Sequence, residues 1–155
     1  MKKKIAILGS TGSIGKTLVE IAKKDKKNFE IKLLTTNQNI KELISQIKIF
    51  NVKNIIVTNY KKFLQIKKKI KNNKINIYND FSQIENILKN IKLDYTMNAI
   101  SGIQGLDPTI RIIKFTKKIA IANKESIICG WSLIKKELKK NNTKFIPVDS
   151  EHFSI

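Results

Sequence analysis

The carboxylates of Asp149 and Glu151, with the nearby histidine His152, are the side chains best suited to metal or acid–base chemistry. Hard oxygen ligands of this kind suit Mg²⁺ or Mn²⁺. Two carboxylates are too few for a complete site, so a further ligand has to come from elsewhere. The alternative is a solvated acidic loop. For His152, the only histidine, a structural role is as plausible as that of a base or a ligand.

A glycine motif, Gly9-x-x-Gly12-x-x-Gly15, lies near the other end of the chain. It follows an expected strand and opens an expected helix, which is the context of a dinucleotide-binding loop. Glycine permits a tight turn and a close approach of pyrophosphate, and the N-terminus of the helix offers free N–H groups. The spacing is GxxGxxG rather than GxGxxG, and the alternative is a glycine turn without a ligand.

The segment Thr35-Thr36-Asn37-Gln38-Asn39 follows the second expected strand. Proteins that bind NAD carry Asp or Glu at this place for the ribose 2′-hydroxyl. An acid there would repel a 2′-phosphate, and this segment has none, so it favours NADP over NAD. The alternative is simply a polar loop.

A third polar segment, Asn123-Lys124-Glu125-Ser126, follows an expected strand and opens a helix. Lys124 could hold a phosphate or polarise a carbonyl, whereas Glu125 in a first helical turn is favoured by the helix dipole alone. The single cysteine, Cys129, falls inside that helix among apolar residues. We interpret it as a packing residue rather than a nucleophile.

The elements that position these residues alternate between short apolar runs and amphipathic stretches. Strands are expected at residues 4–8, 30–35, 54–57, 75–78, 94–100, 118–122 and 144–148, and helices at 13–24, 40–50, 61–71, 81–91, 108–115 and 126–140. In the first helix Ile21 is expected to face inward, and Asp80 with Gln83 resembles a capping box. The alternation predicts an α/β fold, a Rossmann-like doubly wound and mostly parallel sheet.

Ligands bind at the carboxyl ends of the strands in such sheets. Four loops therefore converge on one edge, residues 9–15, 35–39, 101–105 and 123–125. The segment 149–152 follows the last strand and is expected at the same edge.

Length and composition limit the class of protein. The chain has 155 residues, enough for one domain with a core, and a net charge of +19. A nucleic-acid partner could account for this charge. However, 30 of the 31 basic residues are lysine, and arginine, the usual reader of bases, occurs only as Arg111. A lysine-rich composition accounts for the charge better, and we expect no nucleic-acid partner.

One cysteine excludes a disulfide within the chain. No apolar run approaches the roughly 18 residues of a membrane span, and the apolar run at residues 5–8 is too short for a signal peptide. We therefore expect a cytoplasmic protein with no membrane partner.

Together these motifs resemble the 1-deoxy-D-xylulose 5-phosphate reductoisomerase family of non-mevalonate isoprenoid biosynthesis. Four segments carry the resemblance, in the family's order and spacing: Ile7–Gly15, Asn98–Thr109, Ala122–Ser126 and Pro147–His152. The resemblance implies that a ketose phosphate is rearranged to an aldehyde. NADPH then reduces this aldehyde to 2-C-methyl-D-erythritol 4-phosphate.

The resemblance also implies roles for single residues. The implied cofactor-binding residues are Thr11, Gly12, Ser13, Ile14, Asn37, Gln38, Asn39, Asn123 and Glu125. Lys124, Ser150 and Glu151 are implied to contact the sugar phosphate, with Lys124 and Glu151 catalytic. Asp149 and Glu151 are implied to bind Mg²⁺ or Mn²⁺.

This chain departs from the family in two ways. Asn37-Gln38 stands where the family has Gly followed by Lys or Arg, and the missing cation weakens the expected contact to a 2′-phosphate. Family members are also much longer. We therefore expect residues 1–148 to form an NADPH-binding domain and residues 149–155 to begin a truncated catalytic domain.

On this interpretation the rest of the catalytic domain and the C-terminal helical domain are missing. The chain alone is then inactive, and the full-length protein is a homodimer. The alternative is a non-catalytic dinucleotide-binding remnant or module.

Overall fold

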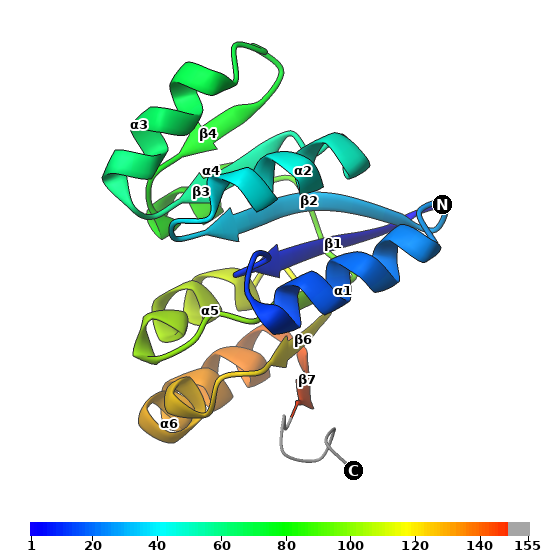
Figure 1. Ribbon diagram of the computed structural model, residues 1–155. Coiled ribbons are helices and arrows are strands. Elements are labelled where there is room, and N and C mark those ends of the chain that lie inside the picture. Colours follow the sequence, from blue (N-terminus) through cyan, green and yellow to red (C-terminus); the bar gives the residue numbers. More distant parts are fainter. Residues whose placement is uncertain (149–155) are drawn as a thin grey trace.

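A seven-stranded sheet forms the centre of the protein in a computed structural model, which describes residues 1–148 (Figure 1). The strand order is β4-β3-β2-β1-β5-β6-β7, and every neighbouring pair is parallel. The strands are β1 (Lys3–Leu8), β2 (Phe29–Thr36), β3 (Asn54–Val57), β4 (Asn76–Tyr78), β5 (Tyr95–Asn98), β6 (Lys118–Ile121) and β7 (Lys144–Pro147). The order reverses direction between β1 and β5, so ligand binding is expected beside these two strands.

Six α-helices connect the strands and cover both faces of the sheet (Figure 1). They are α1 (Ser13–Lys24), α2 (Ile40–Phe50), α3 (Tyr60–Lys69), α4 (Ile84–Leu88), α5 (Leu106–Ile113) and α6 (Lys124–Asn141). Two short 3-10 turns, η1 (Phe81–Gln83) and η2 (Ile103–Gly105), precede α4 and α5. The predicted doubly wound α/β sheet is therefore confirmed, with an entirely parallel sheet.

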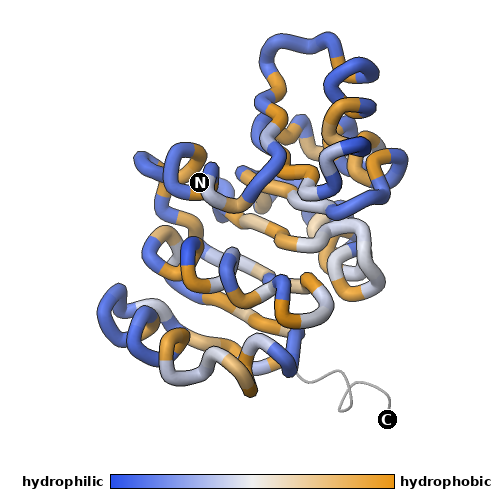
Figure 2. Tube along the Cα trace, turned by 90° about the vertical axis from the view of Figure 1, so that its left-hand side faces the viewer, coloured by the Kyte–Doolittle hydropathy of each residue, from blue (hydrophilic) through white to orange (hydrophobic). Residues whose placement is uncertain are grey.

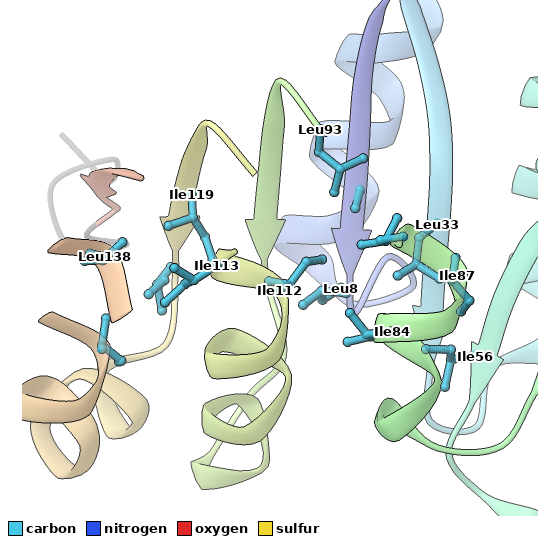
Figure 3. Close-up of a cluster of buried hydrophobic side chains, with 14 residues drawn as sticks. Leu8, Leu33, Ile56, Ile84, Ile87, Leu93, Ile112, Ile113, Ile119 and Leu138 are labelled. Carbon is cyan, nitrogen blue, oxygen red and sulfur yellow. The ribbon is translucent and has the colours of Figure 1, made fainter. Parts of the chain in front are cut away.

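Two apolar cores lie on opposite faces of the sheet because strand side chains alternate between the faces. Ile5 and Ile7 of β1 pack in the core of α1, α2 and α3. Ala6 and Leu8 pack in the other core, with α4, α5 and α6. Figure 3 shows this second core, where Leu8 and Leu33 of the sheet lie near Ile84 of α4 and Ile112 of α5.

In Figure 2 the hydrophobic and hydrophilic colours alternate along the helices, as expected for helices with one buried face, and turns are largely hydrophilic. The predicted elements all occur, with ends that differ by a few residues. The prediction that Ile21 faces inward is wrong, since 55% of its surface is exposed. The buried face of α1 is formed by Gly15, Val19 and Ala22, whereas Ile21 lines a surface hollow beside β5 that no helix among residues 1–148 encloses.

The predicted capping box at Asp80 and Gln83 is also wrong in its second half. Asp80 caps, but its Oδ1 accepts from the N–H of Ser82 at 2.6 Å, and the Gln83 side chain accepts from Asn86 instead of returning to Asp80. The segment begins with the tight turn η1, and α4 ends at Leu88 rather than near Ile91. Among residues 1–148, no helix is long and apolar enough to cross a membrane.

Candidate functional site

A cavity of about 850 Å³ opens at the carboxyl ends of the central strands. Its wall comes from the glycine loop, the ends of β2, β3 and β4, and the segment that leads from β5 into α5. The lining residues are Gly9, Thr11, Gly12, Thr35, Thr36, Asn37, Thr58, Asn79, Asp80, Phe81, Ser82, Ala99, Ile100, Ser101, Gln104, Asp107 and Arg111. This is the edge at which the sequence places its polar loops.

Hydrogen bonds to β2 hold the glycine loop in place. The N–H of Gly9 donates to Thr35 Oγ1 at 2.9 Å, and the N–H of Ser10 donates to the Thr35 carbonyl at 2.9 Å. Thr11 Oγ1 and Thr36 Oγ1 lie 2.6 Å apart and share a hydrogen bond. From α2, Gln46 Nε2 donates to the Ser10 carbonyl at 2.9 Å. The loop is thus fixed before any ligand arrives.

Two positions in the loop accommodate only glycine, one because of its backbone conformation and one because of close neighbouring atoms. Gly9 has φ +75°, a left-handed conformation that favours glycine. A Cβ on Gly15 would lie 2.2 Å from the Gly9 carbonyl oxygen and 2.7 Å from Ser10 Cα. The absence of that Cβ lets α1 approach β1 closely, as the dinucleotide motif requires.

Gly12 caps α1 without a side chain, and the first turn of α1 carries no acidic residue. The N–H groups of the first turn are therefore left to an external anion, and the helix dipole favours negative charge there. Gly12 lines the cavity, and a Cβ at this position would have its nearest neighbour at 3.7 Å. These features fit a pyrophosphate.

The end of β2 is polar and carries no acid, as the sequence predicts. Asn37 is exposed and donates through Nδ2 to Thr58 Oγ1 at 2.9 Å. Gln38 is exposed, and Asn39 uses Oδ1 to cap α2 by accepting from the N–H of Glu42 at 3.1 Å. Of these three residues only Asn37 lines the cavity.

Asn123 is a buried structural residue in the described part of the chain. Its Oδ1 accepts from the N–H of Ser126 and caps α6, while its Nδ2 donates to the carbonyls of Ile100 and Gly102. It therefore fixes the segment that borders the cavity beyond β5. Lys124 and Glu125 begin α6, and both are exposed.

The predicted cofactor residues are only partly gathered around the cavity. Thr11, Gly12 and Asn37 line it, and the remaining predicted residues do not: Ser13, Ile14, Gln38, Asn39, Asn123 and Glu125. Asp149, Ser150, Glu151 and His152 lie outside the described residues. Within residues 1–148 no three His, Cys, Asp or Glu side chains form a group that could hold a metal ion.

The interpretation of Cys129 as a packing residue is wrong within this structure, because its side chain is exposed. The buried side of α6 is formed by Ser126, Gly130, Ile134 and Leu138, and Cys129 points away from that line.

Two parts of the cavity wall were not predicted from the sequence. Thr58 and residues 79–82 lie at the ends of β3 and β4, so the strand-end rule could have found them. Asp107 and Arg111 line the cavity from α5, one helical turn apart. A sequence signal existed for Arg111, which is the only arginine in a lysine-rich chain.

The strand order, the glycine loop and the open end of α1 define a Rossmann-type α/β domain. A family model described as 1-deoxy-D-xylulose 5-phosphate reductoisomerase matches residues 5–130. The chain belongs to this family.

Similar proteins carry the family's name. The chain is 64% identical to 1-deoxy-D-xylulose 5-phosphate reductoisomerase of Pelagibacter ubique over 154 residues, which is 99% of this chain and 40% of that protein. It is 36% identical to the Clostridium tetani enzyme over 155 residues, again 40% of that protein. The chain thus spans about 40% of the length of the curated relatives it matches.

Solved structures agree with this family. The Zymomonas mobilis reductoisomerase in complex with NADPH superposes with a TM-score of 0.88 at 28% identity, over 98% of this chain and 40% of that one. A DOX-P reductoisomerase in complex with magnesium gives 0.87 at 28% identity, over 100% of this chain and 39% of that one. Homoserine dehydrogenase of S. aureus, at 0.54 and 21% identity, shares the fold alone.

Proposed function

We propose that the cavity binds NADPH and that the chain is the cofactor-binding part of a 1-deoxy-D-xylulose 5-phosphate reductoisomerase. The single observation that carries the proposal is the open N-terminus of α1 behind a fixed glycine loop, inside a cavity of about 850 Å³. A related structure contains NADPH at 28% identity, which supports the choice of cofactor.

Within this proposal the pyrophosphate lies at Gly12 and the first turn of α1, and the adenosine half lies along the end of β2. The nicotinamide half then extends toward the ends of β5 and β6, where Asn123, Lys124 and Glu125 follow the sheet. The absence of an acid at Asn37–Asn39 favours NADPH, because no carboxylate there repels the 2′-phosphate. The bound cofactor supplies the hydride.

The substrate side of the proposal rests on residues at the other end of the chain. Lys124, Ser150 and Glu151 contact the sugar phosphate, and Asp149 and Glu151 bind Mg²⁺ or Mn²⁺. Carboxylates are hard ligands for these ions, and a bound metal polarises the substrate carbonyl. The reaction is the conversion of 1-deoxy-D-xylulose 5-phosphate to 2-C-methyl-D-erythritol 4-phosphate. The domain division at residue 148, the homodimer and the cytoplasmic location stay predictions.

Titration of the protein with NADPH, followed by nicotinamide fluorescence, tests the proposal. We expect saturable binding, tighter than for NADH. A Gly12→Val variant should keep the fold, because Gly12 has φ −77° and its Cβ would make only an ordinary contact, 3.7 Å from the Gly9 carbonyl oxygen. The same valine enters the cavity and should abolish binding. The matched control is Thr17→Val, an exposed position on α1 that does not line the cavity.

Two results of this titration would contradict the proposal. Wild-type protein that binds no dinucleotide overturns the proposal. Wild-type binding that Gly12→Val leaves unchanged, in a variant with wild-type circular dichroism, places the cofactor elsewhere and also overturns it.

A further inference from the structure

Arg111 is held in a fixed orientation in the wall of the cavity. Its Nε donates to Asp107 Oδ1 and Oδ2 at 3.0 and 2.9 Å, and its Nη1 donates to Glu85 Oε1 at 3.2 Å. Asp107 lies one turn earlier on α5, and Glu85 belongs to α4. Carboxylates on two helices therefore fix the plane of one guanidinium group.

Such a pair at the surface contributes little to stability, so stability alone is a weak reason for this arrangement. The Arg111 side chain is 33% exposed, and both Arg111 and Asp107 line the cavity. Within the described residues no lysine lines the cavity, although the chain has 30 lysines. The flat, weakly hydrated guanidinium of Arg111 is therefore the one cationic group among the described residues that line the cavity. Planar guanidinium groups stack on aromatic rings, which ammonium groups do less well.

The neighbouring wall supplies an apolar ring and polar edges. Phe81, Asp80 and Ser82 follow β4 and line the same cavity. Hydrogen bonds from Ser82 hold the pKa of Asp80 below its usual value, and the positive charge of Arg111 adds to this effect. The turn η1, which contains Phe81 and Ser82, packs against α5, the helix that carries Arg111. Ile100 and Gln104 complete this end of the cavity.

The position in the sheet decides which half of a dinucleotide reaches this end. The adenosine ribose of a Rossmann-bound dinucleotide lies at the end of the second strand, here at Thr36 and Asn37. The glycine loop, Thr36 and Asn37 line the same cavity as Phe81 and Arg111, whereas Lys124 and Glu125, which begin α6 after β6, do not line it. The base at the Arg111 end is therefore the adenine.

We infer that Arg111, held by Asp107 and Glu85, forms with Phe81 the adenine subsite of this protein, with the guanidinium plane stacked on the base. The inference rests on the proposed binding of a dinucleotide in the cavity. Arg111 is a binding residue that selects an aromatic base, and Asp107 and Glu85 are positioning residues.

Calorimetric titrations with two half-cofactors test the inference, with 2′,5′-ADP as the adenosine half and reduced nicotinamide mononucleotide as the other. Arg111→Leu should lower the affinity for 2′,5′-ADP by about tenfold, as expected for loss of one cation–π contact in a partly desolvated site. Arg111→Lys should lower this affinity nearly as much, because lysine keeps the charge but lacks the planar guanidinium group. Affinity for the nicotinamide half should stay unchanged.

Lys114→Leu is the matched control, since Lys114 also approaches Glu85, at 3.9 Å, from the end of α5 but does not line the cavity. It should leave both affinities unchanged. The decrease of adenine absorbance that accompanies stacking gives a second readout, which the wild type should show and Arg111→Leu should lose. If an Arg111 variant fails to fold, Asp107→Asn provides a second test, because it releases the guanidinium group from one of its two carboxylates. This variant should lower the affinity for 2′,5′-ADP and leave the affinity for the nicotinamide half unchanged.

Three results would overturn the inference. If Arg111→Lys binds 2′,5′-ADP with wild-type affinity, the charge of Arg111 rather than its stacking contributes to binding. If the Arg111 variants lose affinity equally for both half-cofactors, Arg111 has a structural role only. If every variant keeps wild-type affinity, Arg111 does not contact the ligand. Wild-type protein that binds neither half refutes the proposed function itself, which separates the two failures.

Discussion

The side chain of Asn123 shapes one edge of the site. It is buried, it caps α6 through Oδ1, and it donates through Nδ2 to the carbonyls of Ile100 and Gly102. The resemblance implies a cofactor contact for this residue. In this structure its amide is already used, so its first effect on a ligand is to position the segment after β5.

Asn123→Asp separates these two roles of the amide. Aspartate is as good a helix cap as asparagine, but its carboxylate would face two carbonyl oxygens. We expect a loss of about 2–4 kcal/mol in the free energy of unfolding, because buried acceptors lose their donor and meet a charge. Urea denaturation measures it.

Asn59→Asp is the control for this prediction. Asn59 caps α3 by accepting from the N–H of Lys62, and no hydrogen bond from its Nδ2 supports a neighbouring loop within the described contacts. That variant should be nearly neutral. Equal losses at positions 59 and 123 would show that capping alone explains the effect.

Asp94 provides a residue-level test by pH. Its Oδ1 accepts from Lys117 Nζ at 2.8 Å and its Oδ2 from the N–H of Lys4 at 2.9 Å. The hydrogen bond from Lys117, followed by that from Lys4, holds the pKa of Asp94 below its usual value. A lowered folded-state pKa stabilises the protein above the unfolded pKa, and this stabilisation is lost as the pH falls through the folded pKa.

We therefore expect Asp94→Asn to be less stable than wild type by about 1 kcal/mol at neutral pH, since hydrogen bonds to a partly exposed carboxylate contribute modestly. The difference should shrink as the pH falls below about 4, the usual pKa of aspartate. Urea denaturation at a series of pH values measures it. A difference that persists unchanged in acid would contradict the prediction.

At the scale of elements, the packing of α1 on β1 depends on Gly15. The Cβ of Gly15→Ala would meet backbone atoms at 2.2 and 2.7 Å, and backbone cannot rotate away as a side chain does. We expect the free energy of unfolding to fall by about 1–3 kcal/mol from overpacking, together with weaker NADPH binding. Thermal denaturation and the NADPH titration measure the two effects.

Gly12→Ala is the matched control in the same loop, because its Cβ would lie in ordinary contact distance, 3.7 Å from the Gly9 carbonyl oxygen. It should fold with wild-type stability. If Gly15→Ala is as stable as Gly12→Ala, the close approach of α1 to β1 does not require glycine at position 15.

The elements show how far the sequence predicts this fold. Apolar runs such as residues 55–57 of β3 predict the strands, because a short, continuous apolar run is typical of a parallel strand buried on both faces. The end of α4 could not be predicted in this way, since a capping signal at Asp80 is compatible with a 3-10 turn that only tertiary packing selects. The resemblance implies cofactor contacts for Thr11, Gly12 and Asn37, and all three line the cavity. Arg111 could not be predicted in this way, because its position in the wall depends on α4 and α5 lying side by side.

At the scale of the whole molecule, the net charge of +19 predicts weak and nonspecific attraction to nucleic acid. The charge is carried by lysines on solvated surfaces, and the one arginine is engaged with Asp107 and Glu85. We expect any binding to duplex DNA at low salt to disappear near an ionic strength of about 0.15 M. Fluorescence anisotropy across a salt series measures it, and sequence-selective binding at that ionic strength would contradict it.

Turnover is the property of the whole molecule that these 155 residues are not expected to show. The chain matches about 40% of the length of its relatives, and residues 1–148 hold no group of three metal-binding side chains. Hydride transfer requires the substrate and its metal to be held in a near-attack geometry against the nicotinamide, so cofactor binding alone contributes little to the rate.

A polypeptide of residues 1–155 should therefore bind NADPH but not oxidise it when 1-deoxy-D-xylulose 5-phosphate and Mg²⁺ are added. The Pelagibacter ubique reductoisomerase, assayed in parallel, is the positive control. NADPH oxidation that scales with the concentration of the 155-residue polypeptide and yields 2-C-methyl-D-erythritol 4-phosphate would mean that these residues already assemble a complete active site.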